Sequence, residues 1–341
     1  MRAAPRLDWA CLGQSGAARI LIHSRQAGAA LLTAMLTVAL VASLAAGALW
    51  QQWRSVEVEA AERARVQSLW VLTGALDWAR LILREDARSG GPDYLSEPWA
   101  VPLEEARLST FLAADKDSAP DNDANASQAF LSGLISDLQA RLNVTNLVDN
   151  GKISEPALKA FAKLFELLGL PPGELTALAG NLRQALDTSP ENDAAQLAPL
   201  LPQRVDQLVW LGLSPTSLAV LRPYITLLPE RTPVNLNTAS ATVLFACIPS
   251  LDMAQAQRLV SSRQTAPFRS LATVTEQLGQ TAVPLNEAQQ SVTSRFFEVQ
   301  GRLRLDQTVV EEHSVVRRDG LDVKTLWRDR GASGRQTSPL Q

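Results

Sequence analysis

The stretch Arg25-Gln26-Ala27-Gly28-Ala29-Ala30-Leu31-Leu32-Thr33 joins a basic leader to a long apolar segment. Between Arg25 and Arg54 there are 28 residues, and none of them is charged. About 20 apolar residues suffice for a helix to cross a bilayer, so this segment predicts a membrane-spanning helix. A secretory signal peptide instead has a shorter apolar region, and its small-residue cleavage site follows that region. Here the small residues Gly28 and Ala29 come first, so cleavage after Gly28 would leave the membrane helix at the new N-terminus.

The charge of the leader predicts the orientation of this helix. The leader carries four arginines and one aspartate (Arg2, Arg6, Arg19, Arg25 and Asp8). Because basic residues favour the cytoplasmic side, the leader is expected there and the chain after Arg54 on the far side. Trp50 and Trp53 stand where aromatic side chains favour the membrane–water boundary. An ordinary signal anchor that is not cleaved is the alternative interpretation of the same pattern.

The composition excludes several classes of site. The net charge of -3 over 341 residues indicates neither a nucleic-acid-binding protein nor an acidic tail. Only two cysteines and two histidines occur, and after loss of the leader only Cys247 and His313 remain. No internal disulfide is then possible, and a zinc site or a Cys/His nucleophile is not expected. Cys247 is expected to be a small buried apolar residue. The sequence therefore indicates a protein that is not an enzyme, with no catalytic residues.

The helix is expected to continue beyond the membrane. An apolar stripe recurs at three- and four-residue steps, at Val66, Leu69, Leu72, Leu76, Ala79 and Leu83. We therefore predict one helix from Ala29 to Glu85, with its second half packed on a soluble domain. Gly90-Gly91-Pro92 is expected to end it.

The segment after the helix contains an acidic loop and a predicted strand. Residues 113–127 are rich in Asp, Asn, Ala and Ser, and Asp121, Asp123 and Asn125 are spaced like the start of a calcium loop. The sixth position is Ala126 rather than Gly and the twelfth is Ser132 rather than Glu, which favours a solvated loop. Calcium is thus the one ion that the sequence leaves open, and the metal ligands stay unknown. Residues 136–148 partly alternate and are expected to form a strand.

Residues 154–278 have a helical pattern interrupted by Pro and Gly. The motif L-G-L-x-P-x-x-L-x-x-L occurs twice, at 168–178 and at 211–221. It predicts a helix that ends at Gly and a new helix that begins with Pro in its first turn. Short helices that meet at tight turns predict a compact α-domain.

The end of this region is similar to a helix-hairpin-helix unit, a module that often binds the DNA backbone. Its parts are residues 233–244, 248–252 and 267–271, with a capping box predicted between Asp252 and Gln255. The turn Pro249-Ser250-Leu251-Asp252 lacks the glycines of such a hairpin and adds a negative charge. A purely structural use is favoured, and binding of DNA is the alternative.

Strands are expected to close the chain. Residues 296–305 and 307–316 alternate, Asp319-Gly320 is a strong hairpin turn, and residues 321–327 would return as a strand. The tail after Arg328 is expected to be disordered.

This order of elements resembles the minor pseudopilin K family of the type II secretion system, also called general secretion pathway protein K. The most specific matches are Arg25 to Ala29, the E-V-E-A-A-E stretch at 57–62, and the P-V-N-L-N-T-A stretch at 233–239. The resemblance implies an α+β fold. A type IV pilin-like long N-terminal transmembrane helix would pack on a small antiparallel sheet, with a large inserted all-α domain that contains the helix-hairpin-helix-like unit. The expected divisions are a leader (1–28), a transmembrane part (29–50), helix continuation and first sheet part (51–152), inserted α-domain (153–284), closing strands (285–328) and tail (329–341).

The resemblance also implies a function. A prepilin peptidase would cut after Gly28 and methylate the amine of Ala29. The mature protein would be a single-pass inner-membrane protein with its bulk in the periplasm, and it would meet minor pseudopilins I and J and the inner-membrane secretion platform. It would start or cap the pseudopilus at its tip for protein export across the outer membrane. A DNA-binding minor pilin or competence factor is the second hypothesis, although nucleic acid is not the expected partner, and a membrane-anchored enzyme is the third.

Thr33 is the residue that favours the tip. Most pilins have Glu as the fifth mature residue, which pairs with the amine of a subunit already assembled ahead. Here the fifth residue after Gly28 is Thr33. A tip subunit has no partner ahead, and an unpaired carboxylate in hydrocarbon would be costly. The other interpretation is that Thr33 is simply tolerated, with its hydroxyl bonded back to a carbonyl of its own helix.

Two departures from the family pattern bear on these expectations. The leader is longer than is usual for a prepilin. The calcium-associated acidic segment of the family corresponds here to Asp187–Asp193, which is short and lacks aromatic residues. No cofactor is therefore expected.

Overall fold

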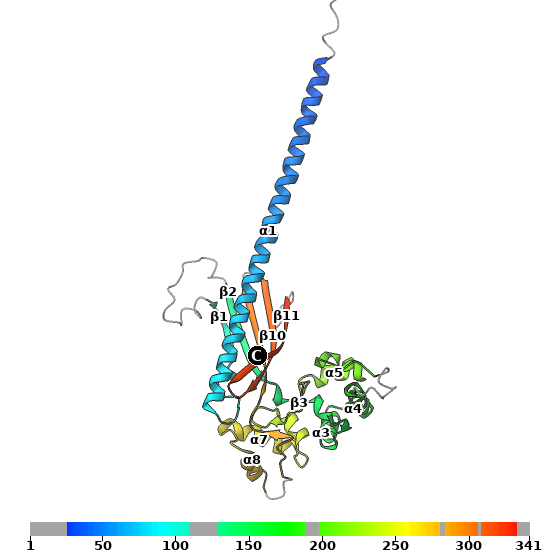
Figure 1. Cartoon of the computed structure of the whole chain (residues 1–341), viewed down its shortest axis with the longest axis vertical. Coiled ribbons are helices and arrows are strands. Elements are labelled where there is room, and N and C mark those ends of the chain that lie inside the picture. Colours follow the sequence, from blue (N-terminus) through cyan, green and yellow to red (C-terminus); the bar gives the residue numbers. More distant parts are fainter. Residues whose placement is uncertain (1–25, 109–128, 188–197, 280–283, 306–307, 333–341) are drawn as a thin grey trace, which may run out of the picture. The chain divides into compact units, whose positions relative to one another are not determined.

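The computed structural model describes residues 26–108, 129–187, 198–279, 284–305 and 308–332 (Figure 1). The chain divides into two units, residues 1–65 and residues 66–341. Helix α1 (Gln26–Ser89) begins in the first unit and ends in the second. It begins three residues before the predicted start at Ala29 and ends four residues after Glu85. Gly90 and Gly91 follow with φ of +68° and +117°, backbone angles that end a helix, as predicted.

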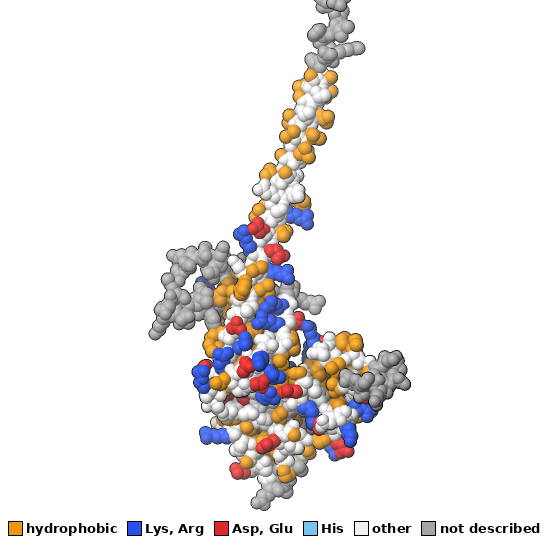
Figure 2. All heavy atoms as spheres, in the orientation of Figure 1, with side chains coloured by type: hydrophobic (Ala, Val, Ile, Leu, Met, Phe, Trp, Pro, Cys, Tyr) orange, Lys and Arg blue, Asp and Glu red, His pale blue; other side chains and the backbone are white. Residues whose placement is uncertain are grey.

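The first unit consists, in its described part, of the first half of α1. Its side chains from Ala29 to Glu62 are exposed, and Figure 2 shows apolar side chains along this part of the helix, followed by charged ones. Among the described residues one helix is long and apolar enough to cross a membrane. A helix whose exposed surface is apolar on all sides over about 20 residues fits a lipid environment.

The second unit contains a five-stranded sheet in the order β1-β2-β9-β10-β11, and each neighbouring pair is antiparallel. Its strands are β1 (Leu103–Arg107), β2 (Ala129–Asp137), β9 (Phe296–Leu305), β10 (Thr308–Asp319) and β11 (Asp322–Ala332). The predicted strand at 296–305 and the hairpin at Asp319-Gly320 are confirmed, with Gly320 at φ +58°. β11 continues to Ala332, so residues 329–332 are strand rather than disordered tail, and residues 333–341 lie outside the described part.

The strand predicted at 136–148 is wrong for most of its length. The long strand β2 ends at Asp137, and two 3₁₀ turns with two-residue strands follow, η3 (Leu138–Ala140), β3 (Leu142–Asn143), η4 (Val144–Leu147) and β4 (Val148–Asp149). The cause is local, because the side chains of Asp137 and Asn143 each accept a hydrogen bond from the backbone N–H two residues later. Such bonds hold the backbone in turns and compete with an extended strand.

The second half of α1 lies on one face of this sheet. Leu76, Ala79 and Leu83 are buried against strand residues that include Phe297 and Val316. Of the predicted stripe, Leu72 to Leu83 is buried as expected, whereas Leu69 is half-buried and Val66 is 49% exposed. The contact with the sheet thus starts about one turn later than the sequence pattern indicated.

The described chain between β2 and β9 is mainly helical, and its helices share one large apolar core. They are α3 (Glu155–Leu167), α4 (Pro172–Leu186), η6 (Val205–Leu211), α5 (Pro215–Leu221), α6 (Ala241–Cys247), α7 (Met253–Thr265) and α8 (Leu271–Leu278). Four two-residue strands accompany them, β5 (Lys152–Ile153), β6 (Ile225–Thr226), β7 (Val234–Asn235) and β8 (Gln290–Ser291). The repeated motif has its predicted form, because Gly169 and Gly212 both have positive φ and the next helices begin at Pro172 and Pro215.

Candidate functional site: the N-terminal anchor and a buried polar junction

The predicted processing and tip residues lie in the first turns of α1. Gly28, Ala29 and Thr33 all fall within this helix. The Thr33 hydroxyl donates to the carbonyl oxygens of Ala30 (2.9 Å) and Ala29 (3.1 Å). The side chain therefore satisfies its own hydrogen-bonding group within the helix and presents no charge to the surroundings.

A buried polar junction joins the sheet to the helical region, and Asp137 is at its centre. Its Oδ2 atom accepts hydrogen bonds from Thr238 Oγ1 (2.5 Å), Ser294 Oγ (2.6 Å) and Asn235 Nδ2 (3.1 Å). Its Oδ1 atom accepts from the Gln139 backbone N–H (2.7 Å). Burial raises the pKa of the Asp137 carboxyl above its usual value, and these hydrogen bonds act in the opposite direction.

The P-V-N-L-N-T-A stretch supplies the partners of this carboxylate. Asn235 also donates to the Asp93 backbone carbonyl (3.1 Å) and accepts from the Asn237 N–H (2.9 Å). Asn237 in turn bonds both the N–H and the carbonyl of Phe268 (2.8 and 2.9 Å). The two asparagines therefore connect the sheet, the segment after α1 and the last helices of the inserted region.

Arg318 extends the junction to α1. It lies on β10, is 8% exposed, and donates to Asp86 on α1 and to Asp93, each at 2.5 Å. Its guanidinium also donates to the Ser294 carbonyl (2.8 Å) and lies 4.9 Å from the centre of the Phe297 ring. Burial raises the pKa of Asp93 to about 6, although the positive charge of Arg318 lowers it.

Three carboxylates meet beside Arg318. Ligand oxygens of Asp86, Asp93 and Glu97 lie within 4.8 Å of one another. Glu97 accepts from the Tyr94 N–H (2.9 Å) and from the Trp99 indole N–H (2.7 Å), and burial raises its pKa to about 7. The arginine thus pairs with two of the three carboxylates, and neutral N–H donors bond the third.

The calcium-like residues Asp121, Asp123 and Asn125 lie outside the described residues. Of the Asp187–Asp193 segment the structure describes Asp187, which ends α4. The described residues therefore do not test whether the chain binds calcium.

The helix-hairpin-helix-like unit is formed by α6 and α7. The predicted capping box is present, because Asp252 and Gln255 bond one another's backbone N–H (2.7 and 2.9 Å). In the connection, the Leu251 N–H donates to the Ile248 carbonyl (3.2 Å), and Pro249 has no N–H. The connection therefore has few amides left to receive a phosphate.

Cys247, at the end of α6, is buried as predicted. Burial raises the pKa of its thiol to about 12, so the sulfur is not a nucleophile at neutral pH. His313 lies on β10, where its Nδ1 is 3.6 Å from a carboxylate oxygen of Glu298. A hydrogen bond to Glu298 raises the pKa of His313.

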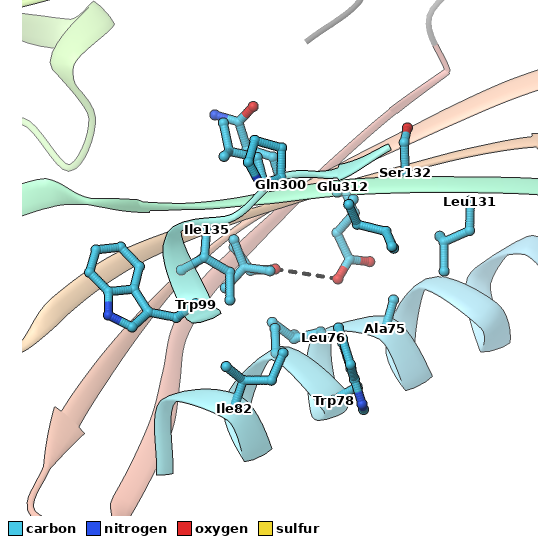
Figure 3. Close-up of a pocket in the computed structure, with 18 of the residues that line it drawn as sticks. Ala75, Leu76, Trp78, Ile82, Trp99, Leu131, Ser132, Ile135, Gln300 and Glu312 are labelled. Carbon is cyan, nitrogen blue, oxygen red and sulfur yellow. Dashed lines mark hydrogen bonds between the residues drawn. The ribbon is translucent and has the colours of Figure 1, made fainter. Parts of the chain in front are cut away.

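A cavity of about 240 Å³ lies between α1 and the sheet (Figure 3). Its walls are mainly apolar and include Leu76, Trp99 and Leu131, with the exposed Trp78 at the rim. One buried carboxylate, Glu312, points toward α1, and its oxygens accept from the Ser314 hydroxyl (3.3 Å) and from the Arg330 side chain (2.5 Å). The cavity thus offers apolar contact and no free charge.

Comparison with known proteins decides the family. Two family models, both described as type II secretion system (T2SS), protein K, match residues 140–230 and 234–294. These matches support the type II secretion system protein K family for this chain. The second match covers residues 234–239 of the polar stretch that joins the junction, and the first covers the repeated motif.

Curated protein K relatives extend the similarity over nearly the whole chain. Type II secretion system protein K of Pseudomonas aeruginosa is 28% identical over 332 residues, which is 91% of this chain and 94% of the relative. That of Pectobacterium carotovorum subsp. carotovorum is 27% identical over 344 residues, which is 91% of this chain and 98% of the relative. These relatives support the predicted family, a minor pseudopilin of type II secretion and protein transport.

A solved structure confirms the fold class. A chain of the GspK–GspI–GspJ complex from the type 2 secretion system of enterotoxigenic Escherichia coli superposes with a TM-score of 0.59 at 19% identity. The match covers 80% of this chain and 99% of that chain. The α+β pilin-like fold with an inserted helical region is thus confirmed, while Gly28, Ala29 and Thr33 stay predictions.

Sequence reasoning missed several residues of the junction. Arg318 of the junction and the cavity residues Glu312 and Ser314 lie at every second position of β10, on its buried face together with Val316. Polar residues at the core positions of an alternating strand were the available signal, because buried polar groups need partners. No comparable signal marked Asp137, which the sequence analysis placed inside a different strand.

Proposed function

We propose that this protein lies at the tip of the type II pseudopilus, where it starts or caps assembly for export across the outer membrane. In this proposal it is a single-pass inner-membrane protein with its bulk in the periplasm. The observation that carries the proposal is Thr33, the fifth residue after Gly28. Its hydroxyl donates to the carbonyls of Ala29 and Ala30 in its own helix.

The physical reason is the cost of a charge in lipid. In the pilin family a glutamate at this position pairs with the amine of the subunit ahead, and a subunit without one ahead would leave the carboxylate unpaired. A lone carboxylate near the middle of a membrane costs about 2.5–3.5 kcal/mol or more. Thr33 avoids that cost, and the helical region between β2 and β9 adds bulk that would hinder a following copy from stacking on top.

The proposed partners follow from the relative and from the processing site. The solved relative was found in a GspK–GspI–GspJ complex, which supports minor pseudopilins I and J as partners here. A prepilin peptidase is the proposed enzyme that cuts after Gly28 and methylates Ala29. The inner-membrane secretion platform is the proposed site at which assembly begins.

The DNA-binding alternative has less support. A hairpin that binds a DNA backbone presents free amides to phosphate, whereas here Asp252 adds a negative charge and its own N–H is bonded to Gln255. Retardation of a DNA duplex by the protein at low salt would favour this alternative over the tip.

The N-terminus of the mature protein tests the processing step. Mass spectrometry of protein from cells with an intact secretion system is expected to find a chain that begins at Ala29 with a methylated amine. A Gly28→Leu variant, which places a bulky side chain at the cleavage position, is expected to keep the leader. A wild-type chain that retains the leader would contradict the proposed processing and support the signal anchor.

A further inference from the structure

We propose that the connection between α6 and α7 is a carbonyl site for a monovalent cation, and that the ammonium group of Lys163 is its resident cation. Lys163 lies on α3, more than 80 residues before the connection. Nothing in the proposed function requires this site, and the two proposals can fail separately.

The geometry around Lys163 Nζ is that of a coordinated cation. Carbonyl oxygens of the α6–α7 connection surround it, at 2.5 Å from Phe245, 3.0 Å from Ile248, and 3.4 Å from both Pro249 and Leu251. The same nitrogen lies 4.2 Å from the centre of the Phe245 ring, a favourable cation–π position. An ammonium has three N–H donors, so four surrounding oxygens act partly through charge rather than through separate hydrogen bonds.

The backbone explains why a positive charge belongs there. The last carbonyls of a helix have no partner within it and form the negative end of its dipole. At the end of α6, Gln290 Nε2 donates to the Cys247 carbonyl (2.8 Å), and Lys163 donates to the carbonyls of Phe245 and Ile248, the second of which also accepts from the Leu251 N–H. Converging backbone carbonyls are also how proteins replace the hydration shell of K⁺, an ion of the same charge as ammonium.

The site can be reached from solvent. A hollow of about 660 Å³ is lined by residues of α3, by the end of α6 and its connection, and by residues 284–290, and both Lys163 and Pro249 lie in its wall. If the amino group is removed, the space that it leaves would open to this hollow, and a small cation from solution could take its place. A larger cation could not approach all of the oxygens.

The test is a thermal unfolding experiment on the full-length chain in detergent. Lys163→Met keeps most of the apolar stem and removes the charge. In the chloride of the bulky cation N-methylglucamine its Tm is expected to fall about 5 °C below that of the wild type. In potassium chloride at equal ionic strength at least half of that loss should be regained, while the wild type changes little. Lys159→Met is the matched control, since Lys159 lies one turn earlier on α3 with its side chain 78% exposed, and it should show no potassium dependence.

Two outcomes would overturn the proposal. The first is a Tm of Lys163→Met that is equally low in both salts, because the carbonyls would then not bind a free cation. The second concerns the wild type and applies even if the variant does not fold. Under mild acetylation Lys163 should react at least about tenfold more slowly than Lys159, because its nitrogen is held among carbonyl oxygens and is less accessible, although burial lowers its pKa. Equal reaction rates of the two lysines, read by peptide mass spectrometry, would show that Lys163 is not held in the site.

Discussion

At the scale of single residues, buried polar groups hold the second unit together. Asp137, Asp93 and Arg318 are each less than 9% exposed, and all of them have hydrogen-bond partners. A buried charge without partners would destabilise the fold by several kcal/mol, so each of these residues depends on the others. The P-V-N-L-N-T-A stretch is therefore a structural motif in this protein, because Asn235 and Thr238 complete the shell of Asp137.

Glu97 gives this network a predictable dependence on pH. Burial raises its pKa from 4.5 to about 7, so between these values the folded chain binds more protons than the unfolded chain. Stability must then fall as pH rises through this window. We expect the free energy of unfolding in urea, followed by tryptophan fluorescence, to be lower at about pH 8 than at about pH 5.

A Glu97→Gln variant separates this contribution from others of the same sign, such as those of Asp93 and His313. The amide can still accept from the Trp99 indole and does not titrate, so the decrease in stability with pH should be smaller. Glu166→Gln, at an exposed site on α3, should show the same change of unfolding free energy with pH as the wild type. An identical slope for all three proteins would mean that Glu97 is ionised throughout this window.

At the scale of elements, the sequence predicted best where one periodic pattern governed a long segment. Apolar spacing and glycines predicted strand β9, the β10–β11 hairpin and both ends of α1. The helix ends lie within four residues of their predicted places. The strand prediction was wrong from Leu138 to Val148. There the side chains of Asp137 and Asn143 accept backbone hydrogen bonds that form turns, although the sequence alternates like a strand. β1 was missed because an edge strand of five residues, three of them charged, carries no apolar signal.

The candidate site was predictable only in part. Gly28, Ala29 and Thr33 are marked by their place before and within an apolar segment, which is a local pattern. The partners of Lys163 and Arg318 come from segments far apart in the chain, up to 232 residues in the case of Asp86. A single sequence has no information on such pairings. The junction and the contacts of Lys163 could therefore be identified only from the structure.

The burial pattern of α1 makes a prediction at this scale. Leu83 is 0% exposed and contributes to the core between α1 and the sheet, whereas Leu81 on the same helix is 46% exposed. Leu83→Ala should lower the free energy of unfolding by about 2–5 kcal/mol, since it removes buried methyl groups and leaves a cavity. Leu81→Ala should change it by less than about 1 kcal/mol. Urea unfolding of both variants checks this, and equal losses would mean that α1 does not pack on the sheet as described.

At the scale of the whole molecule, one chain combines a membrane anchor with a unit whose sheet is interrupted by a helical region. Strands β2 and β9 pair with each other along nine residues, although the helical region separates them in sequence. The inserted region can thus vary in size while the sheet keeps its register. For a subunit at the end of a filament such variation is tolerated, because nothing has to stack beyond it.

The place of this subunit in the assembly is tested by Thr33→Glu. If the chain goes first, the new carboxylate finds no amine ahead of it and remains unpaired in lipid, a cost that reaches about 2.5–3.5 kcal/mol at the membrane centre and is smaller toward the helix end. We expect fewer pseudopili and less secreted protein in cells that carry only this variant. Thr33→Val, which removes the hydroxyl without adding charge, should secrete normally because its apolar side chain suits the membrane. The mature protein should accumulate to the same level in both variants, as measured by immunoblot, so that a secretion defect reports assembly. Normal secretion by Thr33→Glu would indicate that another subunit lies ahead of this one and would contradict the tip position.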